Sequence, residues 1–230
     1  FTSGSAPLLS QTFNLFSERT KHTIVERYGM TETGMNTSNP LHGPAKAGTV
    51  GPPLPGTQCQ ILDDHGDPAA TDETGQLLVR GKNVFKGYWR KPAKTQEDFT
   101  DTGFFKTGDL ASIDEDGYIT IVGRSKDLII TGGLNVYPKE IELKIDKLPG
   151  VIESAVIGTP DKDFGEAVTA IIIAEPTANL SEQMIIEQLK GSIANFKVPK
   201  AVHFLEQLPR NTMGKVQKNV LRETFMKELS

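Results

Sequence analysis

Several features that usually narrow the function of a protein are scarce in this sequence of 230 residues. It has one cysteine, Cys59, which excludes an internal disulfide framework and any metal site built from a Cys-x-x-Cys pair. No run approaches the roughly 20 apolar residues that a transmembrane helix needs, and the longest apolar run, 170–174, suits a buried strand. The formal net charge is −4, which argues against nucleic acid as the main partner.

The start of the chain, Phe1–Ser5, also lacks an initiator methionine and a signal-peptide pattern. We therefore expect a piece cut from a longer protein. A single cysteine makes a reducing, cytoplasmic setting the default expectation. An organelle-targeting segment upstream of residue 1 is an open alternative.

The remaining composition is that of an ordinary globular protein, with 37% hydrophobic and 23% charged residues. Its length allows one large domain or two modest ones. A change of pattern near Gly123–Asp127 favours two. An apolar, strand-like run ends there, Arg124 and Lys126 follow, and a second apolar run leads to the glycine pair 132–133. We expect a joint at this point, between bodies 1–125 and 126–230.

The first body is expected to combine a glycine- and proline-rich segment with a β-rich part. Residues 1 to about 57 contain one helical stretch near 8–18 and a strand at 24–29. From 58 to 122 the pattern is all-β, with turns at 63–66 and 114–117 in which Asp and Gly supply the required backbone conformations. Short strands at this spacing predict a small barrel or a twisted antiparallel sheet.

The second body is expected to be an independent α+β domain. Apolar residues at helical spacing predict helices at 138–148, 181–190 and 218–229, the second of them capped by Ser181. Strands are predicted at 152–158, 167–174 and 201–205.

Three loops carry residues that suit ligand binding, although each alone is a weak signal. Residues 28–34 form a dense run of small and polar side chains, and residues 105–110 place Asp109 before a strand, where it could accept bonds from ribose hydroxyls. Residues 211–216 present Lys215 on a loop before a helix, without the upstream glycines of a P-loop. Surface turns with solvated charges are the plainer alternative for each.

Taken together and in order, these segments resemble the adenylate-forming superfamily of acyl-CoA synthetases, nonribosomal-peptide adenylation domains and firefly luciferase. The matching segments are Tyr28–Glu32, Gly75–Gly81 with Gly87–Trp89, Lys106–Leu110, Gly123–Gly133 with Glu140–Glu142, and Pro209–Lys215. Order and spacing agree along nearly the whole chain. Residues 28–39 look most like the malonyl-CoA synthetases of this group.

The resemblance implies an α/β and α+β multidomain fold. The end of a large AMP-binding N-terminal domain, with a β-barrel-like subdomain at 58–122, would precede a small mobile α+β C-terminal lid that hinges at Lys126. It also implies a two-step ligase reaction. A carboxylic acid would attack the α-phosphate of Mg-ATP to give an acyl-adenylate and pyrophosphate, and the thiol of CoA would then attack the acyl carbon and release AMP.

Residue roles follow from the resemblance alone. The implied nucleotide contacts are Ser5, Ala6, Tyr28, Gly29, Thr31, Asp109, Arg124 and Lys215. Tyr28 would stack on adenine, Asp109 would accept bonds from both ribose hydroxyls, and Arg124 would add a charge-assisted bond. Catalysis would involve Thr31 at the α-phosphate and Lys215, which would bridge carboxylate and phosphate oxygens and stabilise developing charge.

The resemblance also implies sites for the metal, the acid and CoA. Glu32 would hold Mg²⁺, which prefers carboxylate oxygen. Met30, Gly34 and Met35 would wall a short acyl pocket, and Gly132 and Gly133 would line the tunnel for the pantetheine arm of CoA. An acetyltransferase acting on Lys215 is a further expected partner, because acetylation would remove the ammonium charge.

Two elements of the family pattern are missing from this sequence. The phosphate loop that holds the β- and γ-phosphates is absent, and no basic side chain is identifiable that would pair with a second substrate carboxylate. Malonate is thus inferred by likeness. We expect the 230-residue piece to be unable to form acyl-adenylate at a useful rate and at most to bind AMP weakly. A ligase for another short- or medium-chain acid, a carrier-protein-loading adenylation domain and a non-enzymatic binding module are the alternatives.

Overall fold

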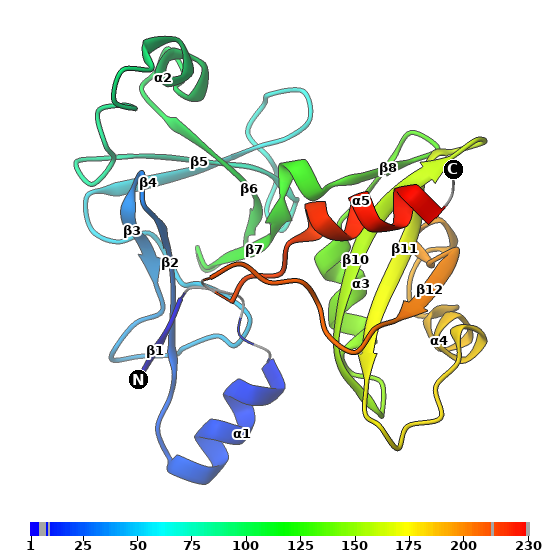
Figure 1. The fold of residues 1–230 in the computed structure, drawn as a ribbon. Helices are drawn as coiled ribbons and strands as arrows, with labels where there is room; N and C mark the ends of the chain where they lie inside the picture. The colour runs from blue at the N-terminus through cyan, green and yellow to red at the C-terminus, as the bar shows by residue number, and fades with distance from the viewer. Residues whose placement is uncertain (5–7, 9, 213, 229–230) are drawn as a thin grey trace. The chain divides into compact units, whose positions relative to one another are not determined.

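The structure is a computed structural model that describes residues 1–4, 8, 10–212 and 214–228. The chain divides into two compact units, Phe1–Ser125 and Lys126–Ser230 (Figure 1). Its helices and strands mix α/β and α+β arrangements, as expected from the sequence. In the described part of the chain no helix is both long and apolar enough to span a membrane.

The first unit contains two sheets. A three-stranded sheet has the order β1-β2-β3, in which β1 runs parallel to β2 and β3 forms an antiparallel hairpin with it. A four-stranded antiparallel sheet has the order β4-β5-β6-β7. The elements are β1 (Thr2–Ser3), α1 (Ser10–Thr20), β2 (Val25–Met30), β3 (Gly34–Ser38), β4 (Thr57–Leu62), β5 (Gly75–Gly81), α2 (Pro92–Asp98), β6 (Phe105–Ile113) and β7 (Ile119–Arg124).

The four-stranded sheet is open, so the prediction of a barrel-like subdomain at 58–122 is wrong and the antiparallel-sheet alternative is correct. Among the described residues β4 and β7 do not pair. Four strands are too few to enclose an interior that side chains can fill, since that takes about eight. The outer edge of β7 is instead occupied by residues 50–51. The amide of Val50 donates to Ile119 (2.8 Å), and the amide of Ile119 donates to Gly51 (3.2 Å).

One face of this sheet builds the core of the first unit. Leu77 and Val79 alternate along β5 and are almost completely buried. They pack with Ile61, Ala111 and Ile119 from the other three strands. Tyr28 packs against the same cluster, so the hairpin β2–β3 is joined to the four-stranded sheet through a shared apolar contact.

The loop between β5 and α2 presents the chain's only tryptophan to solvent. The side chain of Trp89 is 85% exposed, and the guanidinium of Arg90 lies 5.6 Å from its ring centroid. Helix α2 has no buried residue, so no apolar periodicity marks it in the sequence.

The second unit is built on a mixed sheet. Long antiparallel strands β10 and β11 form its centre, β12 joins β11 in parallel, and the β8–β9 hairpin joins the same sheet through Gly165 and Thr131. The elements are β8 (Ile129–Thr131), β9 (Leu134–Val136), α3 (Pro138–Ile145), β10 (Val151–Asp161), β11 (Gly165–Ala174), α4 (Glu182–Leu189), β12 (Ala201–Phe204) and α5 (Lys218–Glu228).

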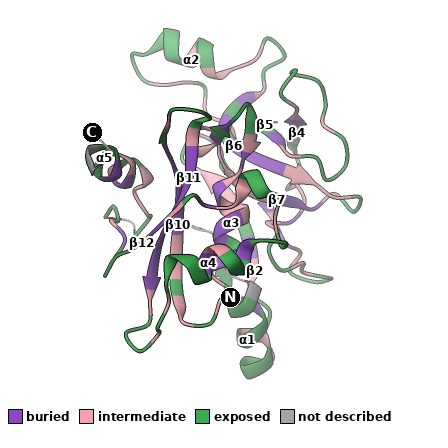
Figure 2. Cartoon of the chain, turned by 90° about the vertical axis from the view of Figure 1, so that its right-hand side faces the viewer, coloured by how far each residue is buried: buried purple, intermediate pink, exposed green. Residues whose placement is uncertain are grey.

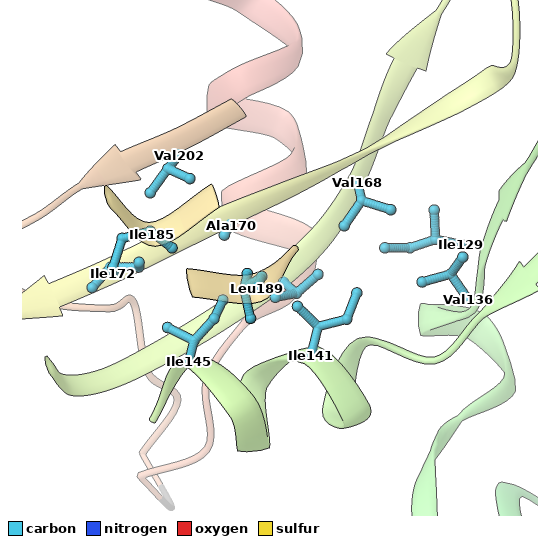
Figure 3. Close-up of a cluster of buried hydrophobic side chains, with 11 residues drawn as sticks. Ile129, Val136, Ile141, Ile145, Val168, Ala170, Ile172, Ile185, Leu189 and Val202 are labelled. Atoms are coloured by element: carbon cyan, nitrogen blue, oxygen red, sulfur yellow. The ribbon is translucent and has the colours of Figure 1, made fainter. Parts of the chain in front are cut away.

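Alternating side chains of β10 and β11 supply two cores. Val156, Ala170 and Ile172 face helices α3 and α4, whose Ile141, Ile145, Ile185 and Leu189 point toward the sheet (Figure 3). On the other face Ile157 and Ile171 pack against Leu221 and Phe225 of α5. The strand β11 is therefore buried along most of its length (Figure 2). The predicted cap of α4 is confirmed, since Ser181 Oγ accepts from the amide of Met184 at 3.3 Å.

Candidate active site

Three side chains that the sequence singles out meet in the first unit. The hydroxyl of Tyr28, on β2, donates to Asp109 Oδ2 at 2.5 Å. Arg124, at the end of β7, places its Nε 2.7 Å from Asp109 Oδ1. Asp109 itself is nearly buried, with 6% of its side chain exposed, whereas 42% of the Arg124 side chain is exposed. The structure thus brings together residues from three separate strands around one carboxylate.

The position of Asp109 differs from the expected loop before a strand. It lies inside β6, opposite Arg124 of β7. Gly108 has φ +72°, and the register between β5 and β6 shifts at this point, because residues 107–109 of β6 lie opposite the single residue Leu77 of β5. A glycine with positive φ and a register shift are marks of a bulge, which turns a side chain out of the regular alternation. Thr107 fixes the bend, because its Oγ1 donates to Leu77 O (2.8 Å) and accepts from the amide of Asp109 (3.0 Å).

The hydroxyl of Tyr28 is held in its protonated form. Burial raises its pKa above the usual range, and the negative charge and hydrogen bond of Asp109 act in the same direction. A protonated phenol is a donor, so Tyr28 orients Asp109 at neutral pH. The resemblance predicted a stacking role for the ring of Tyr28 and did not predict this use of its hydroxyl.

The segment with Thr31 and Glu32 is the turn of the β2–β3 hairpin. Gly29 stands where the two strands approach most closely, because a Cβ there would lie 2.1 Å from the carbonyl oxygen of Gly34. The amide of Thr33 donates to Met30 O (3.1 Å) and closes the turn. Thr31 is exposed and Glu32 is partly buried at the tip. The predicted phosphate and metal contacts therefore occupy one tight turn that glycine makes possible.

A buried amide network supports this turn. Asn83, in the loop after β5, donates to Thr33 O (2.7 Å) and to Asn36 Oδ1 (3.1 Å). Asn36 in turn donates to Thr33 Oγ1 (2.8 Å). Asn36 and Asn83 were not predicted from the sequence. No local signal could have identified them, since the bonds from Asn83 to Thr33 and Asn36 span 50 and 47 positions of the chain.

Glu32 has a partner that was also missed. The hydroxyl of Tyr88 donates to Glu32 Oε1 at 3.3 Å, and burial together with the charge of Glu32 raises the pKa of Tyr88. No three His, Cys, Asp or Glu side chains of the described ranges gather closely enough to hold a metal ion by themselves. Mg²⁺ in nucleotide sites uses one or two carboxylates together with phosphate oxygens, so a lone Glu32 fits an ion that arrives with its nucleotide.

The residues predicted to wall an acyl pocket surround the same turn. Met30 Sδ lies 3.9 Å from the hydroxyl of Tyr28. Gly34 and Met35 are exposed, Met35 by 38%. Ser5 and Ala6, predicted to contact the nucleotide, lie outside the described residues.

Lys215 belongs to the second unit, on the loop between β12 and α5. Its side chain is exposed, and no carboxylate of the described part of that unit forms an ion pair with its ammonium. Its backbone is firmly held. The amide of Lys215 donates to Asn211 Oδ1, and its carbonyl accepts from the amide of Asn211, both at 2.9 Å.

Gly132 and Gly133 form the two-residue turn of the β8–β9 hairpin, with φ +58° and +79°. Positive φ at both positions is what such a turn requires, and glycine supplies it without strain. The amide of Gly132 donates to Phe164 O at 2.9 Å. The sequence identified the glycine pair and missed the hairpin, whose strands have only three residues each.

Lys126 lies exposed in a short 3₁₀ turn, Ser125–Asp127. Its two neighbours are anchored differently. Ser125 Oγ donates to Gly108 O of the first unit at 3.1 Å, whereas Asp127 pairs with Arg222 of helix α5 in the second unit at 2.9 Å.

Comparison with known proteins identifies the family of the chain. The family model of the AMP-binding enzyme matches residues 1–89, and that of the AMP-binding enzyme C-terminal domain matches residues 140–215. The two matches together cover most of the chain. The chain belongs to the family of AMP-binding enzymes.

Similar AMP-binding enzymes include several CoA ligases. A malonate–CoA ligase of Arabidopsis thaliana is 42% identical over 97% of this chain and 38% of its own length. A long-chain-fatty-acid–CoA ligase of Yersinia pestis is 36% identical over 97% of this chain and 40% of its own length. The crystal structure of ATP-bound MatB from Rhodopseudomonas palustris is similar with a TM-score of 0.97 and 55% identity, covering 100% of this chain and 46% of that one. The chain thus spans about two fifths of the length of the curated relatives it matches.

Proposed function

We propose that this chain supplies the nucleotide-binding turn, the ribose site and the catalytic lysine of an ATP-dependent carboxylate–CoA ligase, with malonate as its acid. The observation that carries the proposal is the assembly of Tyr28 and Arg124 around the carboxylate of Asp109, beside the turn with Thr31 and Glu32. Similarity to a malonate–CoA ligase at 42% and to MatB at 55% identity supports the choice of acid.

The proposed ligase reaction has two steps, acyl-adenylate formation and thioester formation. An oxygen of the acid carboxylate bonds to the α-phosphorus of ATP as the bond to the bridging oxygen breaks, which gives acyl-adenylate and pyrophosphate. The CoA thiol then releases its proton to solvent and its sulfur bonds to the acyl carbon, while AMP leaves with the electron pair of the acyl–oxygen bond. Mg²⁺, when bound with ATP, neutralises phosphate charge.

The residues of the first unit would bind and orient the nucleotide. A carboxylate can accept about four hydrogen bonds, so ribose hydroxyls can join those from Tyr28 and Arg124 at Asp109. The ring of Tyr28 and the backbone of Gly29 would border the adenine, Thr31 would contact the α-phosphate, and Glu32 would hold Mg²⁺. The remaining assignments keep to the resemblance, with Met30, Gly34 and Met35 around the acid, Gly132 and Gly133 along the CoA path, and Lys126 as the hinge.

Lys215 would supply the positive charge that the adenylation step needs. Its exposed ammonium and fixed backbone support this role, since a preorganised charge acts without the cost of reorganisation. Lys215→Ala in the longer protein is expected to lower pyrophosphate exchange by about 10²–10³-fold. Thioester formation from supplied acyl-adenylate should continue, because the charge acts in the first step.

The experiment that tests the function is a CoA-release screen of the longer protein with acetate, propionate, malonate, methylmalonate and a medium-chain acid. The proposal expects the largest kcat/KM with malonate. The Yersinia relative favours a second candidate, a ligase for a long-chain acid. A preference for the medium-chain acid over malonate would support that candidate, and AMP release without any CoA thioester would contradict both.

Lys215 is also proposed as a target of a protein acetyltransferase. The side chain is exposed, so an enzyme can reach it, and acetylation would remove the ammonium charge. Lys215→Gln imitates the neutral amide and is expected to lose adenylation. Full adenylation activity of that variant would rule out regulation by acetylation.

A further inference from the structure

The loop that carries Lys215 is a closed hairpin-like turn. The amide of Gln217 donates to Pro209 O at 2.8 Å, and the amide of Gly214 donates to Asn211 O at 2.9 Å. With the bonds between Asn211 and Lys215, these contacts fix the backbone of the loop internally. They do not fix how the loop as a whole is set against the sheet of the second unit.

Arg210 makes that second connection. Its Nη1 donates to the carbonyl oxygen of Gly214 at 2.6 Å, directly before Lys215. Its Nη2 forms an ion pair with Glu153 on β10. One planar guanidinium therefore ties the lysine-bearing loop to a strand, which a single ammonium could not do in the same geometry.

Glu153 stands on a rigid support. It pairs with Ile173 of β11, next to a register shift in β10. Two residues further on, Ala155 belongs to the buried cluster beneath α5, together with Leu208 from the segment leading to the loop. The loop and the carboxylate of Glu153 are thus both attached to segments that pack in the same core.

We infer that Glu153 and Arg210 are positioning residues for Lys215, an inference that rests on the role proposed above for this lysine. The pair is partly exposed, with 41% of the Arg210 and 33% of the Glu153 side chain accessible. Exposed ion pairs add little to folding stability. Displacing a reacting group by about 1 Å can nevertheless cost about 10²-fold in rate. The pair therefore acts on the adenylation rate far more than on the fold.

The first test uses Glu153→Gln and Arg210→Lys in the longer protein. Each variant is expected to lower kcat of ATP–pyrophosphate exchange by about 10- to 100-fold. The rate of thioester formation from supplied malonyl-adenylate and CoA should stay within about twofold of wild type. The matched control is Glu187→Gln, which removes the exposed pair between α4 and Lys190 directly after it and should leave both rates unchanged. Unaltered exchange in both variants, or equal losses in both half-reactions, would overturn the inference.

A second measurement needs no activity. Amide hydrogen exchange of the 230-residue chain should show Gly214 and Lys215 exchanging about 5-fold faster in Arg210→Lys and Glu153→Gln, as expected when one hydrogen bond is lost. Unchanged amide protection in both variants would overturn the inference that Glu153 and Arg210 hold the loop, whatever the measured adenylation rates. If Lys215→Ala keeps full pyrophosphate exchange while the loop amides exchange faster in the Arg210 and Glu153 variants, the role proposed for Lys215 fails. In that case the structural role of Glu153 and Arg210 in holding the loop stands.

Discussion

The hydroxyl of Tyr28 and the carboxylate of Asp109 are separated by 81 positions of the chain and joined by a 2.5 Å hydrogen bond. Tyr28→Phe keeps the ring and removes this donor. Hydrogen bonds to charged groups contribute about 1.5–3 kcal/mol, so we expect a decrease in the free energy of unfolding of that order. AMP affinity should fall as well, because Asp109 loses its orientation. Urea denaturation and calorimetric titration with AMP measure the two effects.

The matched control is Tyr118→Phe, which removes the 2.7 Å bond from that hydroxyl to Pro44 O. This bond is neutral and belongs to a different contact, so the variant should lose about 1 kcal/mol and keep wild-type AMP affinity. Equal AMP affinities for the Tyr28 and Tyr118 variants would contradict an orienting role for the Tyr28 hydroxyl.

The burial of the Glu26 carboxyl predicts that the free energy of unfolding depends on pH. Glu26 is buried on β2, and burial raises its pKa above 4.5, although the amides of Gly48 and Leu8 act in the opposite direction. The folded carboxyl therefore holds its proton more tightly than the unfolded one. Its stabilising contribution is complete below the unfolded pKa and is lost as pH rises through the folded pKa.

Urea denaturation of wild type and Glu26→Gln between about pH 4 and 7 tests this sign. Glutamine stays neutral, so the difference in unfolding free energy should shift in favour of the variant as pH rises. A difference that is constant over this range, or that shifts toward the wild type, would show that burial does not control the titration of Glu26.

The β2–β3 turn depends on a side chain from outside the hairpin. Asn83→Ala would remove the donor to both Thr33 O and Asn36 Oδ1. A buried acceptor left without a partner costs about 1–3 kcal/mol, so stability should fall by at least that amount. Thr57→Ala, which removes the 3.2 Å contact to Asn83 Oδ1 and leaves the turn bonds in place, is the milder control. Comparable losses in the two variants would argue that the turn does not depend on Asn83.

Elements with strong apolar periodicity could be predicted from the sequence, and others could not. The helices α3, α4 and α5 and the strands β10 and β11 have buried faces that repeat at regular spacing. Helix α2 has no buried residue, and the β8–β9 hairpin has strands of three residues, so neither gives a periodic signal. Asp109 was expected in a loop before a strand, whereas Gly108 here bends the strand β6 that contains both residues.

The residues of the candidate site also fall into those that could be predicted from the sequence and those that could not. Tyr28, Asp109 and Arg124 were predicted together because the segments that carry them match the family pattern in order and spacing, although each segment alone is a weak signal. The residues that support the neighbouring β2–β3 turn, which include Asn36, Asn83 and Tyr88, are ordinary polar residues. They become significant only when folding brings them next to the turn.

Over the whole chain, the two units share no core among the described residues: the first unit has one buried apolar cluster and the second has two. Ile172→Ala removes a fully buried side chain beneath α3 and α4 and should cost about 2–5 kcal/mol. Hydrogen exchange should show faster exchange in β10, β11 and β12, with protection of β4–β7 retained. The reciprocal variant is Leu77→Ala, in the core of the first unit, and should produce the opposite pattern. A loss of protection in all strands in either variant would contradict the separation of the cores between the two units.

The exposure of Trp89 decides which optical methods can follow these changes. An indole that is already 85% accessible emits from an aqueous environment before any unfolding takes place. Urea should therefore hardly move its emission maximum, and iodide should quench the native and unfolded chains to nearly the same extent. As the chain's only tryptophan, it reports on a single surface loop before α2. Its fluorescence should therefore not detect the unfolding of the three cores. Circular dichroism is the suitable signal for every denaturation curve described above.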